Sequence, residues 1–132
     1  MILADTDVLI DYLSGAQPIR SQMEDFIERE QIKTTAISCF ELLSGAREGK
    51  RGDAARRLLN CLEVLPLDRA SAACAAVVRR KLDQTGQSIG MADSLIAGIA
   101  LEHGLALFTR NRSHFERVDD LKLVDSGGPT AA

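Results

Sequence analysis

The chain of 132 residues has the size of one globular domain, and its 45% hydrophobic and 27% charged residues are ordinary for a folded protein. Its formal net charge of -3 disfavours a protein that holds nucleic acid by electrostatics alone, because such proteins are basic. No segment resembles a signal peptide or a membrane span, and the first strand is expected from residue 2, so we expect a cytoplasmic protein.

The hydrophobic pattern predicts strands that alternate with helices. Strands are expected at 2–4, 32–35, 64–67 (an edge strand, because Pro66 interrupts it), 105–109 and 121–124. Helices are expected from the Thr6-Asp7 turn through Leu13 and at 19–30, 38–47, 53–62, 69–84 and 91–103, with one turn at 113–116. This order predicts an α/β fold with three layers, in which helices cover both faces of a mostly parallel central sheet. Residues 1–125 would form a single domain, and 126–132 a disordered tail.

Two carboxylates follow the first apolar run. Asp5 comes directly after residues 2–4, and Asp7 lies at the start of a helix that either Thr6 or Asp7 is expected to cap. In open α/β sheets, ligands bind just outside the carboxyl ends of the strands, which is where Asp5 would lie. Asp5 alone could equally be a turn former, so its interpretation depends on the polar residues further along the chain.

Three further polar residues are expected near the same edge of the sheet. Glu41 fits either an S-x-x-E capping box with Ser38 or a position at this edge. Asp93 begins a helix that is apolar nearly all round, so its carboxylate would lie at the border of the core, where a charge is costly unless it is paired or bound to metal. Asn111 follows the strand 105–109 and is either a turn residue or a ligand.

Four side chains would therefore meet at one edge: Asp5, Glu41, Asp93 and Asn111. Clustered carboxylates raise each other's pKa, and a divalent cation removes that penalty. Oxygen ligands without His or Cys favour Mg²⁺ or Mn²⁺. One or two such ions can generate a hydroxide that cleaves a phosphodiester.

The cysteines and histidines are interpreted as structural. Cys39, Cys61 and Cys74 are odd in number and widely spaced, which predicts buried, reduced side chains. His103 and His114 have no partner at metal-ligand spacing, and His103 lies at an expected helix end, where a positive charge suits the helix dipole.

Four motifs, in their order and spacing, resemble the PIN domain, and within it the VapC-like toxins of bacterial toxin–antitoxin pairs. The motifs are residues 2–10 (ILADTDVLI), 35–45 (TAISCFELLSG), 92–97 (ADSLIA) and 107–112 (LFTRNR) with Phe115. Each motif alone is weak, but together they cover nearly the whole chain. The resemblance implies an endoribonuclease that depends on one or two Mg²⁺ or Mn²⁺ ions and acts as the toxin of such a pair.

The resemblance also implies roles for residues of this chain. The family's metal-binding positions map onto Asp5, Glu41, Asp93 and, at a fourth position that is often Asp and sometimes Asn, Asn111. Because Asn offers a neutral carbonyl, one metal site should be weaker than in relatives with four acids. Thr109 would support the site through its hydroxyl, and Asp7 would be a helix cap or an outer acid.

Cations beside the acids would hold RNA through its phosphates. The candidates are Arg47, Lys50 and Arg51 in one group and Arg110 and Arg112 in another, and each could also be a solvated surface charge. The resemblance further implies a VapB-like antitoxin, a homodimer, and transfer RNA or ribosomal RNA as substrate. An apolar groove for the antitoxin could be lined by Leu9, Tyr12, Leu13 and Leu43, and the same residues could equally belong to the core.

Two other interpretations stay open. The DTDV run at 5–8 also fits the first motif of haloacid dehalogenase-type phosphatases, with Asp5 as nucleophile and Asp7 as acid/base. That family needs a Lys before a later acidic pair, whereas Lys122 follows the pair 119–120. A PIN-like domain with one acid replaced could also bind RNA or a partner without cleaving it.

Overall fold

The computed structural model describes residues 1–46 and 48–125. Four parallel strands form one sheet in the order β3-β2-β1-β4. The strands are β1 (Ile2–Ala4), β2 (Ile32–Thr35), β3 (Glu63–Leu65) and β4 (Ala106–Phe108). The predicted edge position of β3 is confirmed, whereas the strand predicted at 121–124 is wrong, since it is reduced to one parallel bridge between Leu107 and Leu123.

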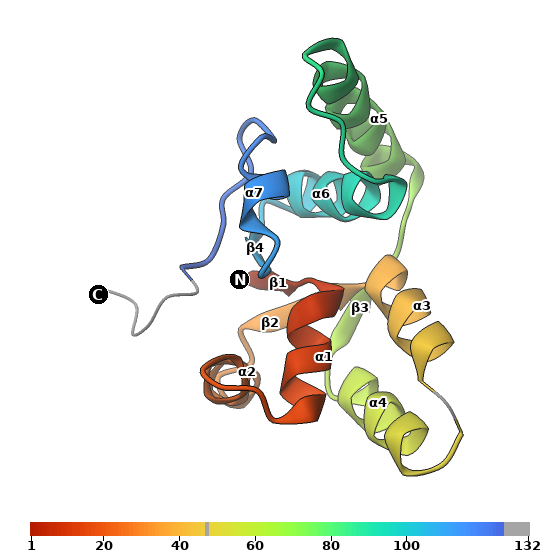
Figure 1. The fold of residues 1–132 in the computed structure, drawn as a ribbon, viewed down its shortest axis with the longest axis vertical. Coiled ribbons are helices and arrows are strands. Elements are labelled where there is room, and N and C mark those ends of the chain that lie inside the picture. Colours follow the sequence, from red (N-terminus) through yellow and green to blue (C-terminus); the bar gives the residue numbers. More distant parts are fainter. Residues whose placement is uncertain (47, 126–132) are drawn as a thin grey trace.

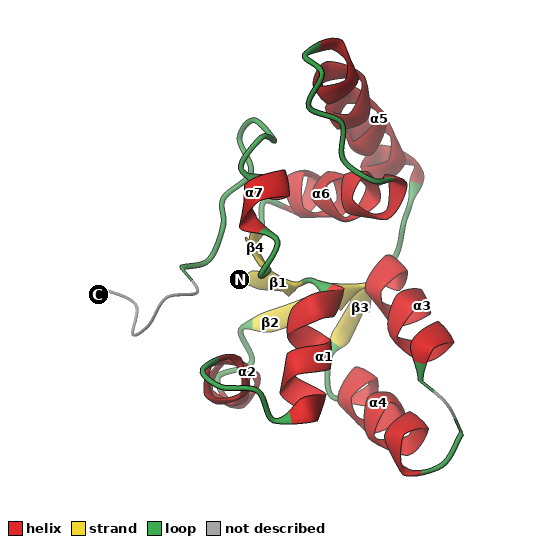
Figure 2. Cartoon of the chain, in the orientation of Figure 1, coloured by secondary structure: helices red, strands yellow, loops and turns green. Residues whose placement is uncertain are grey.

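Pairs of helices connect consecutive strands and cover both faces of the sheet. The helices are α1 (Thr6–Ser14), α2 (Ile19–Glu28), α3 (Ala36–Gly45), α4 (Lys50–Asn60), α5 (Arg69–Gln84), α6 (Met91–His103) and α7 (Arg112–Phe115). In Figure 1, α1, α2 and α4 lie below the sheet, while α5 and α6 lie above it. Figure 2 shows the same three layers by secondary structure, which confirms the predicted architecture.

The core has two parts, one on each face of the sheet. Successive strand residues point to opposite faces. Ala4 therefore joins the cluster that contains Val8 and Leu9, whereas Leu3 joins the cluster that contains Ile96. α6 supplies much of the second cluster, as its apolar sequence predicted.

Helix starts differ from the prediction in three places. α1 is capped by Asp5, whose side chain accepts from Thr6 N, so the prediction of Thr6 or Asp7 as the cap is wrong. α3 begins at Ala36 because the hydroxyl of Thr35 accepts from the amide of Ser38. α4 begins at Lys50, three residues before the helix predicted at 53–62. The earlier start of α3 means that the Ser38 amide is already satisfied and that a capping box with Glu41 is not formed.

The strand order reverses at β1, and this reversal positions the site. From β1 the chain builds β2 and β3 on one side and then returns to place β4 on the other. Ligands of open α/β sheets bind at such a reversal, outside the carboxyl ends of the two strands. The carboxyl ends of β1 and β4 are joined directly, because the amide of Asp5 donates to the carbonyl of Phe108 over 2.9 Å.

The cysteines are free, as predicted, but their predicted burial is wrong. Cys61 is exposed, and Cys39 and Cys74 are half-buried. Cys61 follows the last residue of α4, whose buried face is filled by Leu58 and Leu59 instead.

Among the described residues, no helix combines the length and the apolar character that crossing a membrane requires. The predicted tail, 126–132, lies outside the described residues.

Candidate active site

Asp5 lies at the centre of the strand reversal. Its side chain is 5% exposed, and both carboxylate oxygens accept hydrogen bonds, Oδ1 from Thr6 N and Oδ2 from the hydroxyl of Thr109, each over 2.7 Å. Burial, and then the negative charge of Asp7, raise the pKa of Asp5 to about 7, although the two hydrogen bonds favour the ionised form. A carboxylate this costly to ionise suggests a function that needs its charge.

Thr109, directly after β4, connects the acids of the first motif to the loop that follows it. It is fully buried, and its hydroxyl oxygen accepts from the amide of Asn111 over 3.0 Å while lying 3.3 Å from Asp7 Oδ2. The supporting contact predicted for Thr109 is therefore present. Its single proton favours Asp5 at 2.7 Å over Asp7 at the longer distance.

Asp7 holds the same loop by a backbone contact. Its Oδ2 accepts from the amide of Arg110 over 3.0 Å, and its Oδ1 is buried and has no hydrogen-bond partner among the described residues. Burial is the largest cause that raises the pKa of Asp7. Of the two roles predicted for Asp7, the role of helix cap is wrong, because Asp5 caps α1. The role of an outer acid beside the site stays a prediction.

Glu41 is held by α1. The hydroxyl of Thr6 donates to Glu41 Oε1 over 2.7 Å and lies 2.9 Å from the hydroxyl of Ser38. Because Thr6 has one hydroxyl proton, this pattern requires Ser38 to donate to Thr6 and Thr6 to donate to Glu41. Thr6 thereby contacts two candidate ligands, Asp5 through its backbone amide and Glu41 through its side chain.

Asp93 and Asn111 form a second group, which includes a residue that the sequence interpretation missed. Asn111 Nδ2 donates to Asp93 Oδ2 over 3.3 Å and lies 2.9 Å from His114 Nδ1. Burial is the largest cause that raises the pKa of Asp93, and the charge of Glu41 acts in the same direction. His114, interpreted from sequence as structural, is therefore part of the site. The signal for it was its spacing three residues after Asn111 at the start of a helical turn.

The group of Asp93 and Asn111 lies within electrostatic range of Asp5 and Glu41, since the charge of Asp93 raises the pKa of Asp5 and the charge of Glu41 raises the pKa of Asp93. Within residues 1–46 and 48–125, however, no three His, Cys, Asp or Glu side chains are grouped tightly enough to hold an ion together. The assignment of Asp5, Glu41, Asp93 and Asn111 as metal ligands therefore stays a prediction. The donor chemistry still fits Mg²⁺ or Mn²⁺, because Mg²⁺ is usually held by one or two carboxylates and completed by water and substrate phosphates.

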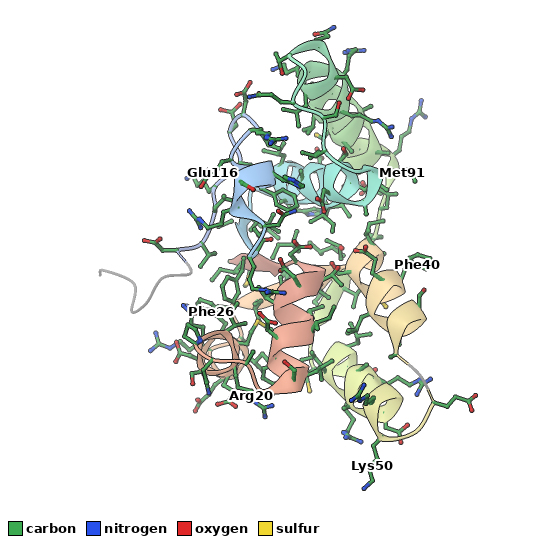
Figure 3. All side chains as sticks on the ribbon, in the orientation of Figure 1. Arg20, Phe26, Phe40, Lys50, Met91 and Glu116 are labelled. Atoms are coloured by element: carbon green, nitrogen blue, oxygen red, sulfur yellow. The ribbon has the colours of Figure 1, made fainter. Side chains whose placement is uncertain are left out.

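The predicted RNA-binding cations are mostly engaged or distant. Arg110 pairs with Asp11 over 2.8 Å, and Arg112 donates to the carbonyl of Val124 over 2.7 Å. Lys50 lies at the outer end of α4, pointing away from the sheet, in Figure 3. Arg51 is its exposed neighbour on α4, and Arg47 lies outside the described residues.

A separate groove of about 310 Å³ lies between α1, α2 and α4. It is lined by Tyr12, Leu13, Arg20, Ile27, Ala54, Arg57, Leu58 and Cys61. Tyr12 and Leu13 were predicted to line an apolar groove. Leu9 is instead fully buried, so it belongs to the core, which was the alternative for these residues, and Leu43 is 39% exposed and does not line this groove.

Residues 2–121 match the PIN domain. The chain belongs to the PIN domain family. Among relatives of this PIN domain, Ribonuclease VapC10 of Mycobacterium tuberculosis is 33% identical over 122 residues, which cover 92% of this chain and 91% of the relative. The tRNA(fMet)-specific endonuclease VapC of Shigella flexneri is 30% identical over 127 residues, 93% of this chain and 96% of the relative.

Solved structures show the same fold. A chain in the DNA-bound VapBC structure from Salmonella typhimurium is 26% identical to this PIN domain, with a TM-score of 0.82 over 94% of this chain and 96% of the other. A chain of FitAcB from Neisseria gonorrhoeae is 28% identical, with a TM-score of 0.75 over 96% of this chain and 98% of the other. Family membership removes the support for the haloacid dehalogenase alternative.

Proposed function

We propose that this PIN domain is an endoribonuclease that depends on Mg²⁺ or Mn²⁺, one or two ions, and acts as the toxin of a toxin–antitoxin pair in the cytoplasm. The observation that carries the proposal is the buried carboxylate of Asp5 at the strand reversal, facing a second acidic group in a site with oxygen ligands. The relatives named as VapC ribonucleases support the same reaction, and the relative named for tRNA(fMet) makes transfer RNA the first substrate to test, ahead of ribosomal RNA.

The residues of the chain divide the work. Asp5 and Asp93 would hold the ion, with Glu41 and the carbonyl of Asn111 as further oxygen ligands, directly or through water. Thr109 orients Asp5, and Thr6 orients Glu41. A bound Mg²⁺ or Mn²⁺ ion would supply the positive charge that activates water and stabilises the phosphate oxygens.

The test is cleavage of total RNA by the purified protein with Mg²⁺ or Mn²⁺, with the cleavage ends mapped by sequencing. Cleavage should stop with EDTA and in Asp5→Asn, and continue in Asp119→Asn, which changes an exposed acid on a different surface. RNA binding without cleavage by the wild-type protein would favour the non-catalytic alternative. Unchanged cleavage by Asp5→Asn would remove Asp5 from the mechanism.

A VapB-like antitoxin is the proposed partner, since solved structures of the same fold are VapBC and FitAB complexes. The groove between α1, α2 and α4 suits an apolar segment with acidic residues, because Arg20 and Arg57 stand beside its apolar lining. Co-expression with the small protein encoded next to it should relieve growth arrest, and Arg57→Glu, which reverses an exposed charge beside the groove, should abolish that relief but not the arrest.

A homodimer is proposed on a different surface. Phe40 on α3 and Met91 at the start of α6 are 70% and 65% exposed, and Figure 3 shows both on the same side of the molecule. Large exposed apolar side chains often mark contacts with another chain. Light scattering should find a dimer for the wild-type protein and a monomer for the Phe40→Asp and Met91→Asp double variant.

A further inference from the structure

The side chain of Asn111 occupies a helix-capping position but is used for another purpose. Asn111 is the N-cap of α7, where Asn is favoured because its side chain can accept from backbone amides. It makes no such bond in this structure. Its amide nitrogen instead lies 2.9 Å from His114 Nδ1 and 3.3 Å from Asp93 Oδ2. The side chain is therefore turned toward the second acidic group.

The neighbours of Asn111 determine which way its amide faces. An ionised carboxylate only accepts hydrogen bonds, so the group that faces Asp93 is the NH₂ and not the carbonyl. The second N–H of that NH₂ reaches His114 Nδ1, which then acts as the acceptor. His114 Nδ1 lies 3.7 Å from Asp93 Oδ2, which is too long for a direct hydrogen bond. Asn111 thus bridges the two residues, and its carbonyl oxygen is left for an external ligand.

The backbone of α7 at His114 is anchored by its neighbour, while the imidazole itself is 44% exposed. The next residue, Phe115, is fully buried and anchors α7 in the core. The backbone of Asn111 is also fixed, since its backbone N–H donates to the hydroxyl of Thr109 over 3.0 Å. Without an acceptor at His114, one of the two N–H groups would lose its partner, and only the longer bond to Asp93 would restrain the amide.

We infer that His114 is a positioning residue: by accepting from Asn111 it directs the Asn111 carbonyl oxygen toward the bound metal ion. This inference rests on the proposed function, because that function supplies the metal ion to which the Asn111 carbonyl would bind. It also explains how a neutral Asn can serve at a site of acids, since the same amide donates to Asp93 and offsets part of its charge.

A pair of matched variants tests the inference. His114→Asn keeps an acceptor oxygen close to the place of Nδ1, whereas His114→Leu has similar branching and no acceptor. The measurements are Mn²⁺ binding to the RNA-free protein by electron paramagnetic resonance, and kcat and KM for RNA cleavage at pH 8, where imidazoles are ordinarily neutral. We expect His114→Leu to weaken Mn²⁺ binding and lower kcat by about tenfold, the usual scale for residues that orient metal ligands. His114→Asn should stay close to the wild-type protein, as should His103→Leu, a change at an exposed histidine.

The decisive comparison repeats His114→Leu in an Asn111→Ala background. If His114 acts through Asn111, the change should have no further effect there. An equal loss in both backgrounds, or a higher KM with unchanged kcat and Mn²⁺ binding, would overturn the inference and indicate direct contact with RNA. Wild-type activity and Mn²⁺ binding in His114→Leu would also overturn it and leave the nuclease proposal standing. A wild-type protein that neither binds Mn²⁺ nor cleaves RNA would instead refute the proposed function itself.

Discussion

Replacing Asp5 by Asn should stabilise the protein while removing its activity. The pKa of Asp5 is raised from 3.8 to about 7, mainly by burial, so the folded state holds the proton more tightly than the unfolded state. The contribution of Asp5 to stability is therefore greatest below pH 3.8 and is lost as the pH rises through about 7. Keeping this side chain ionised in the fold costs about 4 kcal/mol, at 1.36 kcal/mol for each pKa unit.

The substitution should fit the site without new strain or unpaired groups. Asn has the shape of a protonated Asp, and its oxygen can still accept from Thr6 N. Its NH₂ would face the hydroxyl of Thr109, whose oxygen can accept from it. The hydroxyl proton of Thr109 could then be donated to Asp7 Oδ2, which lies 3.3 Å from the hydroxyl oxygen in the structure. The repulsion of Asp5 with Asp7 and Asp93 also disappears, which acts in the same direction.

The assay is urea unfolding of both proteins in EDTA at pH 5 and pH 8. Asp5→Asn should be more stable by about 4 kcal/mol at pH 8 and by about 2 kcal/mol at pH 5, where the folded wild-type Asp5 is largely protonated. Adding Mn²⁺ at pH 8 should raise the stability of the wild-type protein more than that of the variant, because ligand binding to the folded state stabilises it. A variant that is less stable at pH 8, or a difference that does not change with pH, would refute this explanation.

Two further predictions concern the support of the site and the packing of its helices. Thr6→Val removes the hydroxyl that holds Glu41 and should lower kcat by about tenfold with the fold intact, whereas Thr85→Val, at the far end of α5, should leave kcat unchanged. A Cβ at Gly98 would lie 2.6 Å from Ala75 Cβ, so Gly98→Ala should destabilise the protein by about 1–3 kcal/mol in thermal or urea unfolding. Gly45→Ala, where a Cβ meets open space in α3, should stabilise it by roughly 0.5 kcal/mol; equal effects of the two glycine changes would contradict this account of α5–α6 packing.

Local patterns in the sequence predicted most of the fold. α5 and α6 begin and end where helices were predicted at 69–84 and 91–103, and in the structure Asp68 caps the start of α5 and Gly104 the end of α6. Asp5 was recognisable because an acid directly after a buried apolar run is at a strand's carboxyl end. The start of α3 was misplaced because two caps competed, and Thr35 takes the amide that the Ser38 motif suggested.

The contacts that complete the site could not be predicted in this way, since they join residues far apart in the chain. The bridge from Asp93 through Asn111 to His114 depends on how α6 and α7 pack, and only the contact between Asn111 and His114 has a counterpart in their sequence spacing. The same holds for Arg110, which reads as a free cation but is paired with Asp11, a side chain only 13% exposed. Sequence therefore identified the acids, whereas the groups that orient them required the tertiary structure.

The magnitudes explain why helix dipoles cannot take the place of a cation at this site. Asp5 caps α1 and Asp93 lies in the first turn of α6, and both positions favour a negative charge. The dipole contributes only about 0.3–1 kcal/mol at each position. In comparison, ionising Asp5 in the folded protein costs about 4 kcal/mol. The pKa from which this cost follows already includes the hydrogen bonds that Asp5 accepts from Thr6 and Thr109. A divalent ion held between the two helix starts is the kind of charge that can offset the remainder, which is why a stable wild-type protein at pH 8 should depend on metal more than Asp5→Asn does.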